Sequence, residues 1–478
     1  MRKLLLATFA AVLLSAAPAA ANSVVGFGLD FHYELGLGFR TGGVTQPLPV
    51  YGLETAKQLS GGQSTMAAVL DNGELKVAGG NDFGQNGNGR QWIPSPFPTT
   101  ILHGVSQASA GGGDGLALMQ DGTVEVWGGN SYGQLANGVH GGGTEASAIK
   151  LAVDHPIPVP GISGAIQVAS FGATNAVLLS NGTVLGFGED NHGQIGLPEA
   201  KEVIAPRPIA GLSGVVQIAA GGVGKYESDL YALKADGTLW TLGTGARGER
   251  GDGSQVNGGA PRQVKGLSEV SAIAGSRTNG AAVAHGQLYT WGWNAEGALG
   301  YATTETCIKA HPTPCSTIPR PVAGMSSVTS FDAGVETVYE INAGTLYDQG
   351  RDNFGQLGNG STGNASKPQL ILQGAIKVAA LDIGALVETN ATSRPPTRIT
   401  ATAGLNSITV TYTGGKEAFT IGLQPCTGGP KERSTKSKTV ARTTAHSYTI
   451  TGLLPGHEYE VSAGSAKFAR SVVRAKTL

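Results

Sequence analysis

Apolar and polar residues alternate along most of this chain in short segments, which are separated by stretches rich in glycine, asparagine and aspartate. Val105–Ala110, Gly115–Met119 and Thr123–Trp127 are three consecutive examples. Alternation over five or six residues, bounded by turn residues, is typical of β-strands and too short for helices. The pattern predicts an all-β protein.

The same arrangement recurs at a regular interval. The segment WGGNSYGQLA at 127–136 has counterparts at 78–87, 187–196, 242–251, 291–300 and 349–358, with a degenerate copy at 27–36. The second residue of every copy is glycine. In every copy after the one that contains Gly28, another glycine lies six residues before this motif glycine. That earlier glycine is usually part of an Asp-Gly, Asn-Gly or His-Gly pair. Such pairs join antiparallel strands. Units of 49 to 60 residues with about four short strands predict propeller blades, with glycine at the tight turns and Asn, Asp and Gln side chains satisfying loop amides.

The two ends of the repeat region are incomplete in complementary ways. The first copy begins with its second hairpin, near Asn22, whereas Ala375–Asn390 has the opening pattern of a blade and no motif after it. Pairing of these segments removes the exposed edges of an open sheet. We therefore expect a seven-bladed β-propeller over residues 22–393, closed by N- and C-terminal strands.

The motif also carries a family resemblance. The signature W-G-x-N-x-x-G-Q-L-G stands almost intact at 127–136 and 291–300, so residues 22–393 resemble the regulator of chromosome condensation repeat family. The resemblance implies a propeller and offers two directions for function. Nuclear members are guanine-nucleotide exchange factors that bind chromatin, and some secreted bacterial members are inhibitors that cap β-lactamases through one propeller face. No exchange residues can be carried over to this sequence.

The first 21 residues have the features of a signal peptide. Arg2 and Lys3 precede an apolar run from Leu4 to about Leu14, and Ala19-Ala20-Ala21 forms a cleavage site. An uncleaved anchor is the alternative, but the run is shorter than the roughly 20 residues of a membrane span. We expect a secreted or periplasmic, cell-envelope location after cleavage, which together with the net charge of −11 on residues 22–393 argues against the nuclear role.

Residues 394–478 follow a proline-containing linker and predict a small β-sandwich. Its expected strands are 398–403, 407–413, 418–424, 447–453, 459–465 and 471–477. LLPGHEYEV at 453–461 resembles the corner of a fibronectin type III module with Tyr459 as the corner tyrosine, although Tyr412 stands where tryptophan is common. This segment has 12 Lys/Arg against 4 Asp/Glu. Attraction to an anionic envelope polymer or to its own propeller is one interpretation, and two solvated surfaces without a partner is the other.

Cysteine spacing predicts one disulfide. Cys307 and Cys315 bracket CIKAHPTPC, a short loop in a chain expected to be exported. Two free thiols are the alternative, and a metal site with His311 lacks the usual spacing and a fourth ligand. Cys426 is left over, and the sequence does not decide its state.

Catalytic residues, metal ligands and cofactor motifs do not emerge from the sequence. The nine histidines are scattered, and neither a P-loop nor a complete calcium loop is found. A catalytic site can still be built from loops distant in sequence, so a polysaccharide-active lyase or hydrolase of the cell envelope remains the alternative function.

Recognition of another protein is the function that the sequence favours. The residue before the second motif glycine is aromatic or histidine in four copies, where it is Phe83, Tyr132, His192 and Phe354, but Arg247 and Glu296 break the series. Such a ring of side chains on one rim could bind a protein. The other interpretation is that each ring packs over its own turn. Trp92, Tyr226 and Trp293 lie in less regular segments and are further candidates for exposed anchors.

Overall fold

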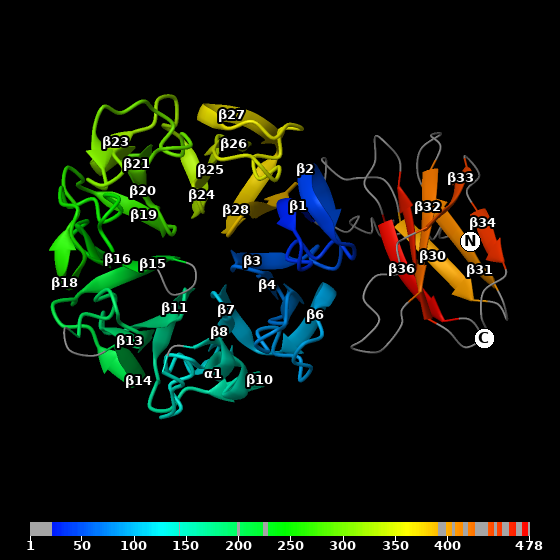
Figure 1. Cartoon of the computed structure of the whole chain (residues 1–478), viewed down its shortest axis with the longest axis horizontal. Helices are drawn as coiled ribbons and strands as arrows, with labels where there is room; N and C mark the ends of the chain where they lie inside the picture. Colours follow the sequence, from blue (N-terminus) through cyan, green and yellow to red (C-terminus); the bar gives the residue numbers. More distant parts are fainter. Residues whose placement is uncertain are drawn as a thin grey trace, which may run out of the picture.

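Seven antiparallel sheets stand around a central channel in the computed structural model, and the predicted seven-bladed propeller is confirmed (Figure 1). The structure describes residues 22–390 except 143, 198–200 and 223–227, and it also describes the strands between Arg398 and Lys476. The predicted signal peptide, Tyr226 and Cys426 lie outside the described residues.

Each of the first six blades is built from strands consecutive in sequence. Blade 1 contains β3 (Ala56–Gly61), β4 (Thr65–Leu70), β5 (Leu75–Gly79) and β6 (Ser95–Leu102), and blade 2 contains β7 (Val105–Ala110), β8 (Asp114–Met119), β9 (Val124–Gly128) and β10 (Val153–Pro158). Blade 3 contains β11 (Ala165–Phe171), β12 (Thr174–Leu179), β13 (Val184–Glu189) and β14 (Glu202–Pro208). Blade 4 contains β15 (Val215–Gly222), β16 (Ser228–Lys234), β17 (Leu239–Gly243) and β18 (Gly258–Gln263).

Blade 5 has an additional short strand. It contains β19 (Val270–Gly275), β20 (Asn279–Ala284), β21 (Gln287–Trp293), β22 (Thr306–Cys307) and β23 (Thr313–Pro321). Blade 6 contains β24 (Val328–Gly334), β25 (Thr337–Asn342), β26 (Thr345–Gly350) and β27 (Ala365–Gln373). The first strand of each blade lines the central channel, a cavity of about 310 Å³.

Blade 7 joins the two ends of the propeller, as the sequence predicts. Its sheet order is β2-β1-β29-β28, where β1 (Ser23–Asp30) and β2 (Thr41–Val50) come from the start of the propeller sequence and β28 (Ala375–Leu381) and β29 (Gly384–Thr389) from its end. β1 and β29 pair without a register shift from Ser23↔Thr389 to Gly28↔Gly384. The ring therefore has no open edge between its first and last blades.

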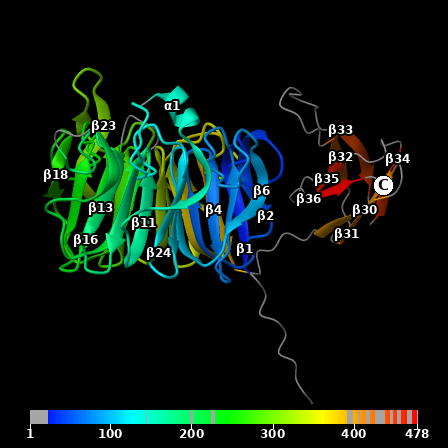
Figure 2. The same ribbon diagram turned by 90° about the horizontal axis from the view of Figure 1, so that it is seen from below.

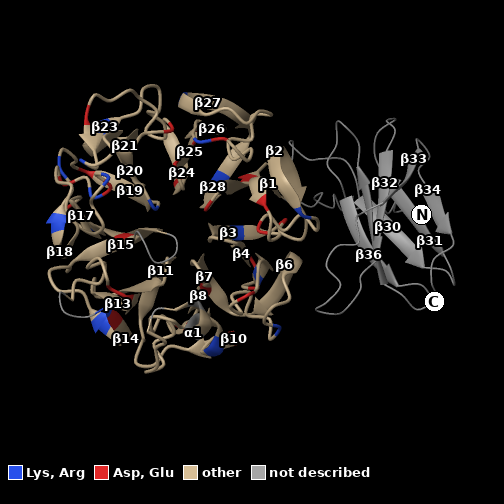
Figure 3. Cartoon of the chain, viewed as in Figure 1, with Lys and Arg blue, Asp and Glu red and all other residues tan. Residues whose placement is uncertain are grey.

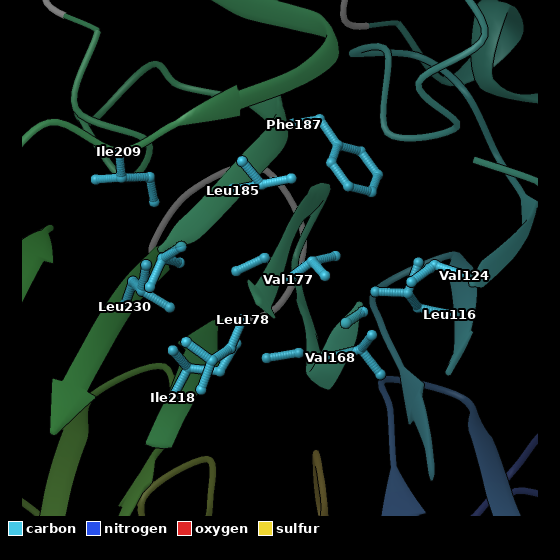
Figure 4. Close-up of a cluster of buried hydrophobic side chains, with 14 of the residues drawn as sticks. Leu116, Val124, Val168, Val177, Leu178, Leu185, Phe187, Ile209, Ile218 and Leu230 are labelled. Carbon is cyan, nitrogen blue, oxygen red and sulfur yellow. The ribbon is translucent and has the colours of Figure 1, made fainter. Parts of the chain in front are cut away.

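The core lies between blades rather than within them. Alternate residues of the middle strands face opposite neighbours, so Val177 of blade 3 points toward blade 2 and Leu178 toward blade 4 (Figure 4). Leu116 and Val124 come from blade 2, and Ile218 and Leu230 from blade 4. Because each blade covers the apolar faces of its neighbours, the complete ring is needed to bury the core.

The backbone geometry at the motif positions requires glycine. Gly128 ends the third strand of blade 2 with a φ of +103°, and a Cβ there would lie 2.5 Å from the carbonyl oxygen of Gly113. Its counterparts in the other blades also have positive φ and a carbonyl oxygen within 2.4 Å of such a Cβ. Only glycine combines this dihedral with so close an approach.

Beyond the propeller, two further sheets are described. One has the order β30-β31-β34, from β30 (Arg398–Ala403), β31 (Ser407–Thr413) and β34 (Ser447–Thr451). The other has the order β33-β32-β35-β36, from β33 (Lys438–Thr443), β32 (Phe419–Pro425), β35 (Glu458–Gly464) and β36 (Ser471–Lys476). Six strands agree with the sequence expectation, and β33 was not predicted because its charged residues hide the alternation.

Helix is nearly absent from the described part of the chain. The short α1 (Glu145–Lys150) lies in the loop between β9 and β10. Across the described residues, no helix has the length and apolar character required to cross a membrane.

Candidate protein-binding face

The loops between the third and fourth strands of all seven blades form one face of the ring, which we call the motif face. Their described residues are 31–40, 80–94, 129–142, 144–152, 190–197, 201, 244–257, 294–312 and 351–364. α1 and the loop that precedes β23 rise on the same side of the disc (Figure 2). The opposite side, which we call the turn face, carries the tight turns between second and third strands, such as 71–74 and 120–123.

Side chains of the repeat motif stabilise the loops of the motif face through hydrogen bonds to the backbone of the same loop. In blade 2 the Asn130 side-chain oxygen accepts a hydrogen bond from the Leu135 amide at 3.1 Å, and the Gln134 side-chain oxygen accepts one from the Tyr132 amide at 2.9 Å. The first bond recurs at Asp30, Asn81, Asp190, Asn294 and Asp352, and the second at Glu34, Gln85, Gln194, Glu249 and Gln356. These carboxyl and amide groups satisfy amides that no strand reaches, as the sequence predicts.

The next blade then fixes several of these loops. The indole nitrogen of Trp127 in blade 2 donates to the Gln85 carbonyl of blade 1 at 2.8 Å, and that of Trp291 in blade 5 donates to the Glu249 carbonyl of blade 4 at 2.7 Å. Both tryptophans are buried. The motif face is therefore a rigid platform and not a set of independent loops.

The predicted aromatic series lies on the motif face but is half-buried. Phe83, Tyr132, His192 and Phe354 each donate a backbone amide hydrogen bond to the glutamine two residues later. Phe83 reaches the following blade, since its ring lies beside Gly113, and Phe354 makes an edge contact with Phe31 of blade 7 at 6.2 Å between ring centroids. These two rings therefore contact the following blade.

The two described tryptophan candidates differ from each other. Trp293 is half-buried, and the Arg247 guanidinium lies 5.2 Å from the centroid of its ring. Trp92 is 55% exposed and has a φ of +72°, a left-handed conformation that is strained for a bulky residue.

Burial lowers the pKa of His192, so its ring is kept neutral rather than charged.

Five exposed apolar side chains lie on the motif face, and sequence reasoning found only one of them. Of the eleven large hydrophobic residues that are exposed in the described propeller, five lie in its loops: Phe31, Trp92, Ile93, Val139 and Val256. Four of the five were not predicted. The sequence feature that could have identified them is an apolar residue inside a loop rich in glycine and asparagine.

The acidic surplus of the propeller sequence is largely internal. Twelve carboxyl side chains are buried in the described residues: Asp30, Glu34, Asp114, Glu189, Asp190, Asp229, Glu249, Asp252, Glu340, Asp348, Asp352 and Glu388. Burial raises the pKa of Asp30 to about 8 and that of Asp114 to about 7. Basic and acidic positions are interspersed around the ring (Figure 3). The formal charge of −11 therefore does not describe the propeller surface.

Among the described residues, no group of three His, Cys, Asp or Glu side chains is placed to hold a metal ion. Cys307 and Cys315 form a disulfide with their Cα atoms 5.8 Å apart, as their spacing predicts.

Comparison with known proteins finds the same repeat in two parts of the chain. The sequence model for the Regulator of chromosome condensation (RCC1) repeat matches residues 181–223 and 285–338. These two segments therefore match the regulator of chromosome condensation repeat. Over 204 residues, 41% of its length, it is 27% identical to the E3 ubiquitin-protein ligase HERC2 of Homo sapiens, and over 221 residues, 45% of its length, it is 26% identical to the ultraviolet-B receptor UVR8 of Arabidopsis thaliana. These matches span 4% of HERC2 and 48% of UVR8.

Solved structures share the propeller of this repeat protein. Human WBSCR16 superposes with a TM-score of 0.66 at 19% identity, covering 77% of this chain and 99% of that protein. Yeast RCC1 (Prp20), crystallised with Kap60, superposes with a TM-score of 0.67 at 19% identity, covering 82% of this chain and 98% of that one. At this identity the likeness shows the common fold.

Proposed function

We propose that this protein is a secreted, non-catalytic binding protein that holds another protein on its motif face. The five exposed apolar side chains on that face, from the loops of four blades, carry the proposal. Apolar and aromatic anchors dominate the energetics of protein interfaces. The loops beneath them are fixed by buried hydrogen bonds, so little entropy is lost when a partner binds.

Two other observations support this function. Yeast RCC1, a propeller of the same fold, was crystallised with the protein Kap60. Secretion is inferred from the N-terminal sequence, and the disulfide between Cys307 and Cys315 suits an oxidising compartment. The resemblance to secreted inhibitors that use one propeller face points the same way.

A paired comparison of variants tests the proposal. The full mature chain is immobilised, exposed to the native secretome and envelope extract, and assayed for a partner retained in stoichiometric amount. Trp92→Ala with Ile93→Ala should abolish retention. Ile166→Ala with Val216→Ala is the matched control, because these residues are similarly exposed, at 51% and 52%, but lie at the start of β11 and β15 toward the turn face.

Equal retention by wild type and the Trp92/Ile93 variant, or loss only in the control, excludes the motif face as the binding surface. Release of sugars from envelope polysaccharide by the purified protein would instead favour a catalytic role.

A further inference from the structure

A hairpin of blade 5 projects from the motif face and carries a pattern that the proposed function does not use. β22 pairs with the start of β23 through Thr306↔Pro314 and Cys307↔Thr313, and the disulfide between Cys307 and Cys315 closes it. We call residues 306–315 the disulfide hairpin. Figure 2 shows it rising above the disc next to the label β23.

The base of the disulfide hairpin is held firmly. Both half-cystines are buried. The Glu305 carboxylate accepts hydrogen bonds from the Thr317 amide at 3.0 Å and the Thr317 hydroxyl at 2.6 Å, and the Thr303 hydroxyl donates to the Cys315 carbonyl at 2.8 Å. The position and direction of the hairpin are therefore set by blade 5 itself.

The tip is exposed and carries a cation. Lys309, Ala310, His311 and Pro312 are all exposed, in a turn closed by a hydrogen bond of 3.0 Å from the His311 amide to the Ile308 carbonyl. Lys309 makes no ion pair with any residue that the structure describes. Ile308, directly before it, has a φ of +59°, which is a strained conformation for a β-branched residue.

We propose that the disulfide hairpin docks in the active-site cleft of a trypsin-class serine protease, with the Lys309 side chain entering the specificity pocket. In that class the pocket is a slot with a carboxylate that selects lysine or arginine. An ammonium group at the end of a narrow projection fits such a slot. A partner with a flat acidic surface would not need the lysine to be carried on a projection. The small Ala310 leaves room beside the Lys309 carbonyl.

Covalent closure suits this partner. A loop closed by a disulfide and containing Pro312 and Pro314 has few conformations to lose on binding. If the protease hydrolyses the Lys309–Ala310 bond, water supplies the hydroxyl of the new carboxyl group and a hydrogen of the new amine, while the disulfide keeps both ends attached.

Trypsin itself is the probe. The full mature protein should inhibit hydrolysis of a small chromogenic lysine substrate competitively, with an inhibition constant near or below about 1 μM. Lys309→Ala should weaken inhibition at least about 30-fold, because the carboxylate of the pocket loses its partner. Lys309→Phe should transfer inhibition to chymotrypsin, whose pocket is an apolar slot.

Two controls separate this inference from the proposed function. Lys265→Ala removes an exposed lysine from another loop and should leave inhibition unchanged. Trp92→Ala should also leave it unchanged, since Trp92 belongs to blade 1, and thermal melting shows that each variant is folded.

The inference is overturned by absence of inhibition at about 100 μM protein. It is also overturned if Lys309→Ala inhibits as well as wild type, if Lys309→Phe does not inhibit chymotrypsin, or if trypsin cleaves Lys309–Ala310 rapidly without lasting inhibition.

Discussion

At the scale of single residues, the motif loops depend on one acceptor whose chemistry varies between blades. Asn130 and its counterparts Asn81 and Asn294 also donate their amide nitrogens to loop carbonyls, for example Asn130 to Val139 at 3.0 Å. At Asp30 the same place holds a carboxyl group, one oxygen of which is buried without a hydrogen-bond partner in the described structure. Burial raises the pKa of this group to about 8, so the carboxyl group is uncharged at neutral pH, as the amide is in the other blades.

Replacement of Asp30 by asparagine should change how stability depends on pH. The folded chain keeps the Asp30 proton up to about pH 8, whereas the unfolded chain releases it near the ordinary value of 3.8, so wild-type stability falls as pH rises between these values. Asp30→Asn removes this loss, and its free energy of unfolding relative to wild type should increase by up to about 3 kcal/mol from pH 5 to pH 8. Urea denaturation at both pH values measures the difference.

Asp121→Asn is the matched control, because Asp121 is exposed and hydrogen bonds from Thr123 lower its pKa. It should show no gain over the same range. If the free energy of unfolding of Asp30→Asn differs from that of wild type by the same amount at pH 5 and pH 8, the raised pKa of Asp30 is contradicted.

A second residue-scale prediction concerns the motif glycines. Gly128→Ala forces a side chain into a positive φ and against the Gly113 carbonyl, so the free energy of unfolding should fall by at least about 2 kcal/mol. Gly138→Ala is the control, because its φ is +79° but nothing lies within 4 Å of its added Cβ. It should cost only about 1 kcal/mol. Equal losses in the two variants would show that the dihedral alone matters.

At the scale of elements, every blade has proline in the strand that follows its motif loop, which is the outer strand of all blades except blade 5, where the short β22 lies beyond it. β2, β6, β10, β14, β18, β23 and β27 all contain proline, and all of them follow the motif loop in sequence. Proline has no amide hydrogen to donate, so it is tolerated at a sheet edge and discourages pairing with another sheet. The outer strands therefore protect the rim of the propeller, and the same prolines explain why their alternation is weak.

The contact between neighbouring blades predicts a large effect at Trp127. Trp127→Phe leaves the buried Gln85 carbonyl without its indole donor and opens a cavity, so we expect a loss of about 2–4 kcal/mol in the free energy of unfolding. Trp240→Phe is the comparison, because Trp240 is half-buried and donates only to Thr238 within its own blade. It should cost about 1 kcal/mol or less, and thermal and chemical denaturation measure both. A Trp127→Phe loss no larger than this would mean that the hydrogen bond between blades contributes little.

At the scale of the whole molecule, stability depends on closing the ring. Blade 7 unites residues separated by more than 360 positions, and the Ser23 and Thr389 hydroxyl oxygens lie 2.7 Å apart at the end of the closing pair. Joining segments so distant in sequence is entropically costly, and the apolar faces of blades 1 and 6 become covered only when it occurs. Closure should therefore come late in folding.

An engineered bridge tests this closure. In the Ser23→Cys/Thr389→Cys variant the two thiols should form a disulfide, which raises the free energy of unfolding by up to about 5 kcal/mol because it closes a very long loop in the unfolded chain. Chemical denaturation of the oxidised and reduced variant gives the effect, with Ser23→Cys alone as the control. Failure of these two cysteines to join under oxidising conditions would contradict the β1–β29 pairing.

Local patterns in the sequence determined the repeat, the strand order within a blade, the turn glycines and the incomplete ends that close the ring, because each depends on backbone conformation over a few neighbouring residues. Only the tertiary structure decided which side chains remain exposed. Phe83 and Phe31 both occupy motif loops, but the following blade half-covers Phe83 and leaves Phe31 open. It likewise decided that the carboxyl groups of Asp30 and Asp114 are internal, since burial depends on the neighbouring blade and net charge does not record it.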